Sequence, residues 1–297
     1  MKVRIGFASG VSGDGHDEQF GPLVDDLERL GFDSLWLSER VSSPIHDPLV
    51  GLAYAAGRTR RLKLGTSVLV LPGRNPVLLA KELASLDRLS GGRLLPAFGL
   101  GSDDAAERAA FGVPPRERGA WLDEALPLLR RLWSEDSVDH AGPRFTYQGL
   151  RVRPRPVQPA LDLWLGGRAP GALRRVGRLA DGWLPGGCTP AEAAAGRRTI
   201  EAAAAEAGRA IDPEHYGAIV VYAHADTPPA TVAAALARRP EVDPRELVPI
   251  GLPALRVALR RFVDVGVSKF LVRPAAAPAS WTAELEALAA AVLPLQT

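Results

Sequence analysis

The chain has 297 residues, of which 46% are hydrophobic and 24% are charged, and its formal net charge is +2. This composition is that of a globular protein with a large core, and the small net charge without blocks of like charge argues against nucleic-acid binding. No apolar run approaches the roughly 20 residues of a membrane span, and the opening MKVRIGFASG is too polar for a signal peptide, so we expect a cytoplasmic protein that contacts no membrane.

Short apolar runs alternate with longer amphipathic segments along the chain. In residues 20–30, leucines recur at the spacing of one helix face. Asp47-Pro48 and Asn75-Pro76 each place a capping side chain before a proline, a pattern that predicts the start of a helix. The expected helices are residues 20–30, 48–56, 76–89, 116–133, 169–179 and 190–208. The expected strands are residues 3–7, 34–37, 62–70, 94–98, 163–165, 182–184, 218–222 and 270–272.

This alternation of strands and helices predicts βαβ units and a parallel sheet. The strands are short and apolar, as expected when both faces of the sheet are buried. Right-handed crossovers leave two arrangements, a closed barrel and an open doubly wound sheet. Eight expected strands favour the barrel, so the predicted fold class is α/β, a (β/α)8 TIM barrel. We assign residues 1–297 to this one domain, because no linker or fixed-period repeat interrupts them.

Two segments fall outside the repeat and are expected to be insertions in the barrel. Residues 145–147 and 150–152 flank Gln148-Gly149, which predicts a small hairpin with its turn at that dipeptide. The proline-rich residues 226–251 could form either a lid or an excursion between the last two strands.

In a barrel of this type the reacting groups lie at the C-terminal ends of the strands, which selects a few places in the sequence. Glu39 and Arg40 follow the second strand, and they form either an ion-paired barrel rim or polar contacts to a ring across the barrel mouth. Residues 65–68 lie in the third strand. His46 is either an exposed loop or capping histidine or a proton donor near the ring.

Glycines follow the fourth and fifth strands. Gly99 and Gly101 either make a tight turn or let a flat ligand approach the backbone. Gly166 and Gly167 precede a helix, whose free N–H groups attract anions, and Arg168 lies beside the position expected for a phosphate. The histidines show no ligand spacing with carboxylates and no nucleophile elbow is present, so we expect neither a metal site nor a serine triad.

Four blocks of sequence carry a family resemblance. They are LERLGFDSLWLSER, RTRRLKLGTSVLVLPGRNPVLLAKELASLDRLSGGRLLPAFGLG, FGVPPRERGAWLDEALPLLRRLW and LWLGGRAPGALRRVGRLADGWLPG. In this order they resemble the bacterial luciferase-like monooxygenase superfamily, and the block LGTSVL is similar to that of the branch that uses the deazaflavin coenzyme F420. The last hundred or so residues match only loosely.

This resemblance implies a redox enzyme that holds its cofactor at the C-terminal ends of the barrel strands. It also implies a non-prolyl cis peptide bond between Ser67 and Val68, in a bulge behind the ring, with Val68 supporting the ring. The residues that would line the ring are Glu39, Thr66, Ser67, Val68, Gly99 and Gly101. Those that would hold the phosphate are Gly166, Gly167 and Arg168. The candidates for substrate polarisation or proton transfer are Glu39, Arg40, His46 and Asp103.

The chain departs from the F420-dependent glucose-6-phosphate dehydrogenases of that branch at two of these places. Those proteins have Ser-Asp-His after the second strand, where this chain has Ser38-Glu39-Arg40, and their acidic residue after the fourth strand corresponds to Ser102. Dehydrogenation of a sugar phosphate by the same residues is therefore not expected. Arg40 would instead offer a fixed positive charge near the ring or the substrate.

Three functions remain open on the sequence. The preferred one is an F420-dependent oxidoreductase that moves a hydride between the deazaflavin and a small organic substrate. The second keeps the fold but uses reduced FMN and oxygen, as a two-component monooxygenase. The third is a carrier or sensor that binds a flavin without catalysis. The resemblance also implies a homodimer. Helices 48–56 and 76–89 either form the contact between the two subunits or pack only on the barrel.

Overall fold

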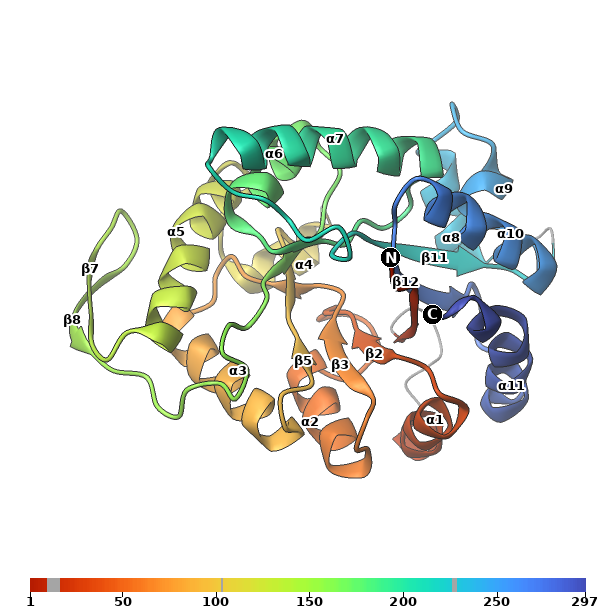
Figure 1. The fold of residues 1–297 in the computed structure, drawn as a ribbon, viewed down its shortest axis with the longest axis horizontal. Helices are drawn as coiled ribbons and strands as arrows, with labels where there is room; N and C mark the ends of the chain where they lie inside the picture. The colour runs from red at the N-terminus through yellow and green to blue at the C-terminus, as the bar shows by residue number, and fades with distance from the viewer. Residues whose placement is uncertain (10–16, 103, 226–228) are drawn as a thin grey trace.

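The protein is described by a computed structural model, which covers residues 1–9, 17–102, 104–225 and 229–297 (Figure 1). The strands are β1 (Arg4–Ser9), β2 (Ser34–Leu37), β3 (Lys63–Thr66), β4 (Leu69–Val70), β5 (Leu94–Leu95), β6 (Ala97–Gly99), β7 (Val138–Ala141), β8 (Thr146–Leu150), β9 (Trp164–Leu165), β10 (Gly182–Trp183), β11 (Gly217–Tyr222) and β12 (Lys269–Pro274). The helices are α1 (Asp17–Leu30), α2 (Pro48–Arg58), α3 (Pro76–Ser90), α4 (Ala105–Phe111), α5 (Pro115–Ser134), α6 (Pro170–Leu179), α7 (Pro190–Glu206), α8 (Ala230–Ala237), α9 (Pro244–Leu247), α10 (Gly251–Asp264) and α11 (Trp281–Val292), followed by a 3-10 turn (Leu293–Leu295).

The parallel strands form a ring. One sheet has the order β11-β12-β1-β2-β3-β5, and a second has the order β10-β9-β6-β4. The two sheets are continuous, because β3 and β4 together make up the predicted strand 62–70, and β5 and β6 make up the predicted strand 94–98. Single parallel bridges from Trp183 to Tyr216 and from Gly186 to Ile219 then join β10 to β11. The described residues thus confirm the predicted strands and the (β/α)8 barrel, with helices on its outside (Figure 1).

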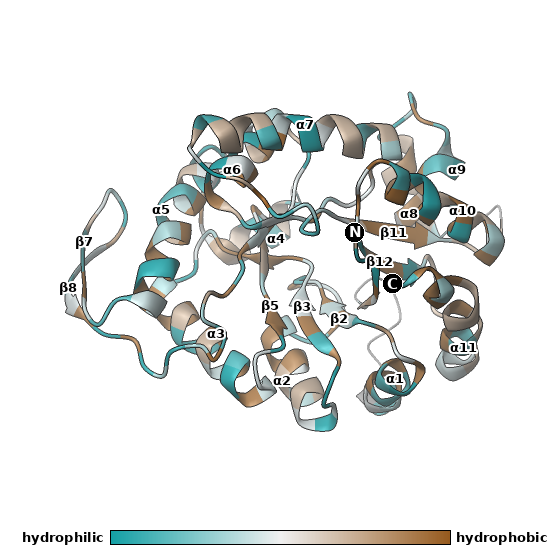
Figure 2. Cartoon of the chain, viewed as in Figure 1, coloured by the Kyte–Doolittle hydropathy of each residue, from teal (hydrophilic) through white to brown (hydrophobic). Residues whose placement is uncertain are grey.

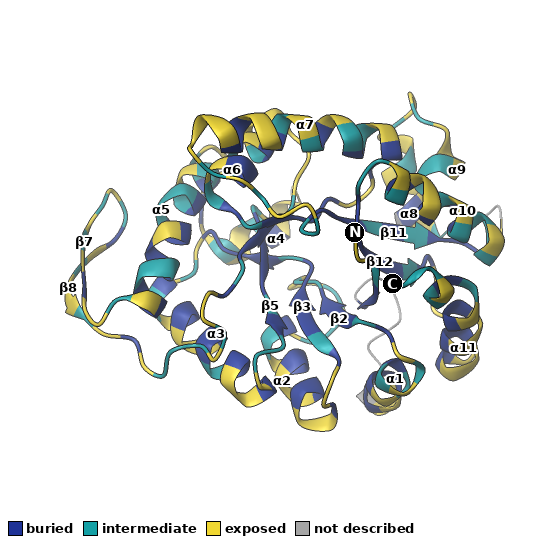
Figure 3. Cartoon of the chain, in the orientation of Figure 1, coloured by how far each residue is buried: buried dark blue, intermediate teal, exposed yellow. Residues whose placement is uncertain are grey.

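Tryptophans fill the inside of the barrel. Trp36 and Trp164 are completely or almost completely buried, with ring centroids 6.5 Å apart. A Cβ atom at Gly65 would lie 2.2 Å from the Trp36 ring, and a Cβ atom at Gly182 would lie 2.4 Å from the Trp164 ring. Glycine at these two strand positions therefore makes room for the large side chains. The barrel strands are hydrophobic and buried, whereas the helices around them expose polar outer faces (Figures 2 and 3).

The hairpin of the structure is not the predicted one, because its first strand is β7, whereas the predicted strands 145–147 and 150–152 fall on β8 and the residues next to it. β7 pairs with β8 in antiparallel fashion, and the Gly142 N–H donates to the Phe145 carbonyl across the turn. Gln148-Gly149 lies inside β8 instead. The turn is held in place because the Glu124 carboxylate of α5 accepts hydrogen bonds from the backbone N–H groups of residues 144 and 145. This contact from a distant helix could not be read from the local sequence.

Lowering the pH is expected to reduce the free energy of unfolding through protonation of Asp33. Its carboxylate is nearly buried and lies 3.2 Å from both Lys63 Nζ and Lys269 Nζ. Burial raises the pKa of Asp33, but Lys269 and Lys63 lower it more, so the pKa lies below its usual range. A carboxyl with a lowered folded-state pKa stabilises the fold above its unfolded pKa, about 3.9, and loses this contribution as the pH falls through the folded value. Urea unfolding of the wild type and Asp33→Asn from pH 7 to 2 should therefore show a shallower pH dependence for the variant below about pH 4; equal slopes would contradict this role.

Candidate functional site

A cavity of about 480 Å³ lies at the C-terminal ends of β2, β4, β6 and β9. Of the residues selected from the sequence, the cavity wall includes Glu39, Arg40, Ser67, Val68, Gly99, Gly101, Gly166, Gly167 and Arg168. These residues come from separate segments of the chain, and the closure of the barrel brings them to one mouth. The size is within the usual range for a small-molecule site.

Val68 is the central side chain of this wall. The peptide bond between Ser67 and Val68 is cis, as the resemblance implied. A Cβ atom at Gly99 would lie 2.5 Å from one Val68 methyl carbon, and a Cβ atom at Gly166 would lie 3.2 Å from the other. The glycine at position 99 therefore makes room for Val68, rather than serving only as a point where a ligand approaches the backbone.

The Glu39 carboxylate lines the cavity with both oxygens engaged. One oxygen accepts a hydrogen bond of 2.6 Å from the Val70 N–H, and the other pairs with the Arg74 guanidinium. Burial raises the pKa of Glu39, and the nearby Arg74 opposes this shift in part. These contacts tie the chain after β2 to β4 and to Arg74, and so help to fix the shape of the cavity wall.

The opposite end of the cavity is suited to an anion. Gly167 has a φ of +97°, which favours glycine, and the Trp183 indole N–H donates to its carbonyl at 2.8 Å. Helix α6 begins just after, and its N-cap residue, Ala169, provides no side-chain cap. The helix start therefore keeps N–H groups available to a ligand. Arg168 adds a positive charge at this end and lies 3.7 Å from Glu192.

Two buried charged residues of the wall were missed by the sequence analysis. Arg118 of α5 is 4% exposed, and its guanidinium donates to the carbonyls of Leu100, Ser102 and Val113. A further guanidinium nitrogen, Nη2, has no hydrogen-bond partner among the described residues. The signal was present, because Arg118 lies at helical spacing from the buried Leu122 on the inner face of an amphipathic helix.

Glu107 of α4 is the second missed residue. Its carboxylate accepts hydrogen bonds from the Val41 N–H and from the N–H and hydroxyl of Ser42, and so anchors the loop that follows β2. Burial raises the pKa of Glu107, but the hydrogen bonds from Ser42 and Val41 lower it more, with a smaller contribution from Arg40. The pKa is below its usual range, which disfavours a role as a proton donor at neutral pH.

Two of the selected residues that the structure describes are not part of the wall. His46 packs edge-on against Phe20, with ring centroids 5.0 Å apart, and does not line this cavity. The Thr66 hydroxyl is buried between neighbouring strands, where it donates to the Ala97 carbonyl at 2.7 Å and accepts from the Ala97 N–H at 2.8 Å. Asp103 lies outside the described residues.

Thr66→Val is expected to lower the free energy of unfolding by about 2 kcal/mol, because it leaves two buried backbone groups of Ala97 unpaired. Cofactor affinity should not change, since the hydroxyl faces the neighbouring strand. Urea unfolding and a binding titration on the same preparation measure both quantities. A variant of normal stability that binds cofactor poorly would instead place Thr66 at the ligand.

Other reactive groups are poorly placed in the described part of the chain. Cys188 is buried, and burial raises the pKa of its thiol to about 12. No group of three or more His, Cys, Asp or Glu side chains among the described residues could hold a metal ion. None of the described helices combines the length and apolar character needed to span a bilayer.

Comparisons with known proteins agree with this geometry. The sequence model described as luciferase-like monooxygenase matches residues 4–295. An F420-dependent glucose-6-phosphate dehydrogenase from Kineococcus radiotolerans is 36% identical over 182 residues, which cover 56% of this chain and 53% of that protein. The chain thus aligns with about half the length of this relative.

Solved structures extend the likeness to the whole chain at the level of the fold. An F420-dependent secondary alcohol dehydrogenase in complex with an F420-acetone adduct has a TM-score of 0.81 at 19% identity and covers 100% of both chains. The oxygenating constituent of 3,6-diketocamphane monooxygenase from Pseudomonas putida, in complex with FMN, has a TM-score of 0.80 at 17% identity and covers 100% of this chain and 99% of its own.

Proposed function

Because the chain belongs to the luciferase-like monooxygenase family, we propose that it is an F420-dependent oxidoreductase, which moves a hydride between the deazaflavin and a small organic substrate. The observation that carries this proposal is the cavity around Val68, with a helix start and Arg168 at its other end. The F420-dependent relative supports the choice of cofactor.

The residues of the cavity fit such a cofactor. Gly99 and Gly166 leave Val68 as a raised apolar surface, against which a flat ring can lie. The Gly166 N–H already donates to the Phe98 carbonyl at 2.9 Å, so the backbone N–H groups that suit a phosphate are those of Gly167 and the start of α6. Arg118 and Arg168 make this part of the wall positively charged, which suits an anionic group.

In this proposal the bound deazaflavin supplies two-electron hydride chemistry, and the protein supplies position and charge. Val68 would support the ring from the cavity wall. Ser38 and Ser67, whose hydroxyl oxygens are 3.2 Å apart, offer polar groups at the ring edge. Arg40 is exposed at the mouth and would polarise a substrate oxygen. Glu39, Arg40, His46 and Asp103 remain the predicted candidates for catalysis.

The choice between F420 and FMN is tested by direct titration. We expect the protein to bind F420 at least about tenfold more tightly than FMN, a difference of about 1.4 kcal/mol, as measured by fluorescence quenching of each cofactor. Tighter binding of FMN would favour the second function, which the FMN-bound neighbour supports. Binding of either cofactor without turnover of any substrate would favour the carrier.

We also propose that the protein is a homodimer joined through α2 and α3. These helices pack together, and they expose Val50, Tyr54, Leu78 and Leu89, of which Leu89 is 78% exposed. Large apolar side chains that are exposed on two neighbouring helices are typical of an interface.

Leu78→Glu is therefore expected to convert the dimer into a monomer, because it places a charge in an apolar interface. Light scattering coupled to size-exclusion chromatography measures the change in mass. The matched control is Val257→Glu, at another exposed valine on α10, which should leave the mass unchanged. If both variants and the wild type have the mass of one chain, the homodimer is wrong.

A further inference from the structure

The excursion between β11 and β12 folds over one side of the barrel mouth. Side chains alternate along a strand, and Ile219 of β11 packs against the barrel interior. The next residues of the same phase are Val221 and Ala223, and these pack with Val232 and Val248 of the excursion. A parallel bridge between Ala223 and Ile250 holds the returning chain beside β11. The excursion thus covers inward-facing positions at the C-terminal end of the barrel.

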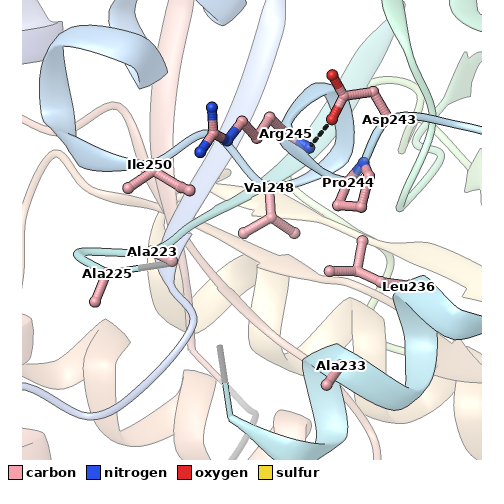
Figure 4. Close-up of a pocket in the computed structure, with 9 residues that line it drawn as sticks. All are labelled: Ala223, Ala225, Ala233, Leu236, Asp243, Pro244, Arg245, Val248 and Ile250. Carbon is pink, nitrogen blue, oxygen red and sulfur yellow. Dashed lines mark hydrogen bonds between the residues drawn. The ribbon is translucent and has the colours of Figure 1, made fainter. Parts of the chain in front are cut away.

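A second cavity, of about 430 Å³, lies under this cover (Figure 4). Its apolar wall consists of Ala223, Ala225, Ala233, Leu236, Val248 and Ile250. In Figure 4, Val248 and Leu236 extend into the cavity from opposite sides, and Ala233 lies on α8 below them. The small alanine side chains leave the space open, and the larger side chains give it hydrophobic walls.

The charged groups of this second cavity lie at its edge. Asp243 caps α9, where its side-chain oxygen accepts a hydrogen bond of 2.9 Å from the Arg245 N–H. Figure 4 shows the Arg245 guanidinium directed away from Val248 and Leu236. A ligand part inside the cavity would therefore meet mainly hydrocarbon. A sugar phosphate would lose the hydration of its hydroxyl groups there without gaining partners for them.

We propose that this cavity holds the hydrocarbon part of the substrate, so that the substrate is an apolar aliphatic or aromatic compound and not a sugar phosphate. This inference rests on the proposed oxidoreductase function, because it assigns the substrate class of that reaction. The first cavity is lined by residues at the C-terminal ends of β2, β4, β6 and β9, and the second by residues beyond the C-terminal end of β11, a parallel strand of the same barrel. The cofactor occupies the first and the apolar part of the substrate occupies the second.

The test uses the purified full chain and 1-anilinonaphthalene-8-sulfonate as a fluorescent apolar probe. Straight-chain alcohols from butanol to octanol are added as competitors, and glucose 6-phosphate is added as the polar counterpart. We expect each added methylene to strengthen displacement about three- to fourfold, and glucose 6-phosphate to displace nothing. Ala233→Phe should fill the cavity and weaken octanol binding at least about tenfold. The control is Ala234→Phe, on the same helix and also exposed but outside the cavity wall, which should bind octanol as the wild type does.

F420 affinity, measured on the same three proteins, separates this inference from the proposed function. Suppose that F420 binds normally, but that displacement does not depend on the chain length of the alcohol or that the two phenylalanine variants have equal effects. Either result would overturn the proposed substrate class and leave the proposed function intact. Displacement by glucose 6-phosphate would also overturn it. If F420 and FMN both fail to bind while the alcohols behave as expected, the cavity stands as an apolar site and its assignment to this reaction falls.

Discussion

Gly99→Ala is expected to weaken cofactor binding roughly 30-fold, the equivalent of about 2 kcal/mol of overpacking. The added Cβ atom would lie 2.5 Å from a Val68 methyl carbon, well inside van der Waals contact. Val68 is β-branched and has few alternative rotamers, so it must shift toward the space that the ring would occupy. A fluorescence titration with F420 measures the loss of affinity.

Combining Gly99→Ala with Val68→Ala tests whether the loss of affinity is caused by the contact between these two residues. If the effect of Gly99→Ala acts through Val68, then Gly99→Ala combined with Val68→Ala should bind cofactor as well as Val68→Ala alone, because the clash is removed. Gly57→Ala is the control for glycine replacement, since a Cβ atom at Gly57 meets nothing within 4 Å. A double variant that binds cofactor about 30-fold more weakly than Val68→Ala alone would show that the two residues act independently.

Arg118→Met is expected to lower the free energy of unfolding by about 3 kcal/mol, and to weaken cofactor binding in the same protein. Methionine fills a similar space but leaves the carbonyls of Leu100, Ser102 and Val113 without their donor. Residues 100–102, which follow β6, form part of the cavity wall, so their loosening should affect the ligand as well as the fold.

Arg118→Lys provides the matched comparison. Lysine keeps the charge but cannot reach three carbonyls in a planar array, so we expect it to recover cofactor affinity more fully than stability. Urea unfolding and cofactor titration at low and high salt separate the two effects, because only the electrostatic part is screened. If Arg118→Met were as stable as the wild type, this would contradict the expectation that Arg118 stabilises the fold through its hydrogen bonds to the three carbonyls.

The barrel was predictable because its signals are local. Each strand is a short apolar run, and capping residues before proline mark α2 and α3, where Asp47 and Asn75 do accept hydrogen bonds from the first helical turn. The site followed in turn from one rule, that strand ends meet at the barrel mouth. That rule needs the order of the strands and no knowledge of side-chain contacts.

The parts that escaped prediction depend on contacts between distant segments. The turn of the β7–β8 hairpin is held by Glu124, and the loop after β2 is anchored by Glu107, which lies about 65 residues further along the chain. The helices α10 and α11 went unassigned, and the excursion gave no signal that it would enclose an apolar cavity. His46 follows β2 in the chain, but it packs on Phe20 of α1.

A crystal structure of the protein with bound F420 tests the central claim most directly. We expect the deazaflavin ring to lie against the Val68 side chain, with its phosphate within hydrogen-bond distance of the Gly167 backbone or the start of α6. A ring bound elsewhere on the barrel, or a phosphate that contacts neither Gly166–Gly167 nor Arg168, would contradict the assignment of this cavity.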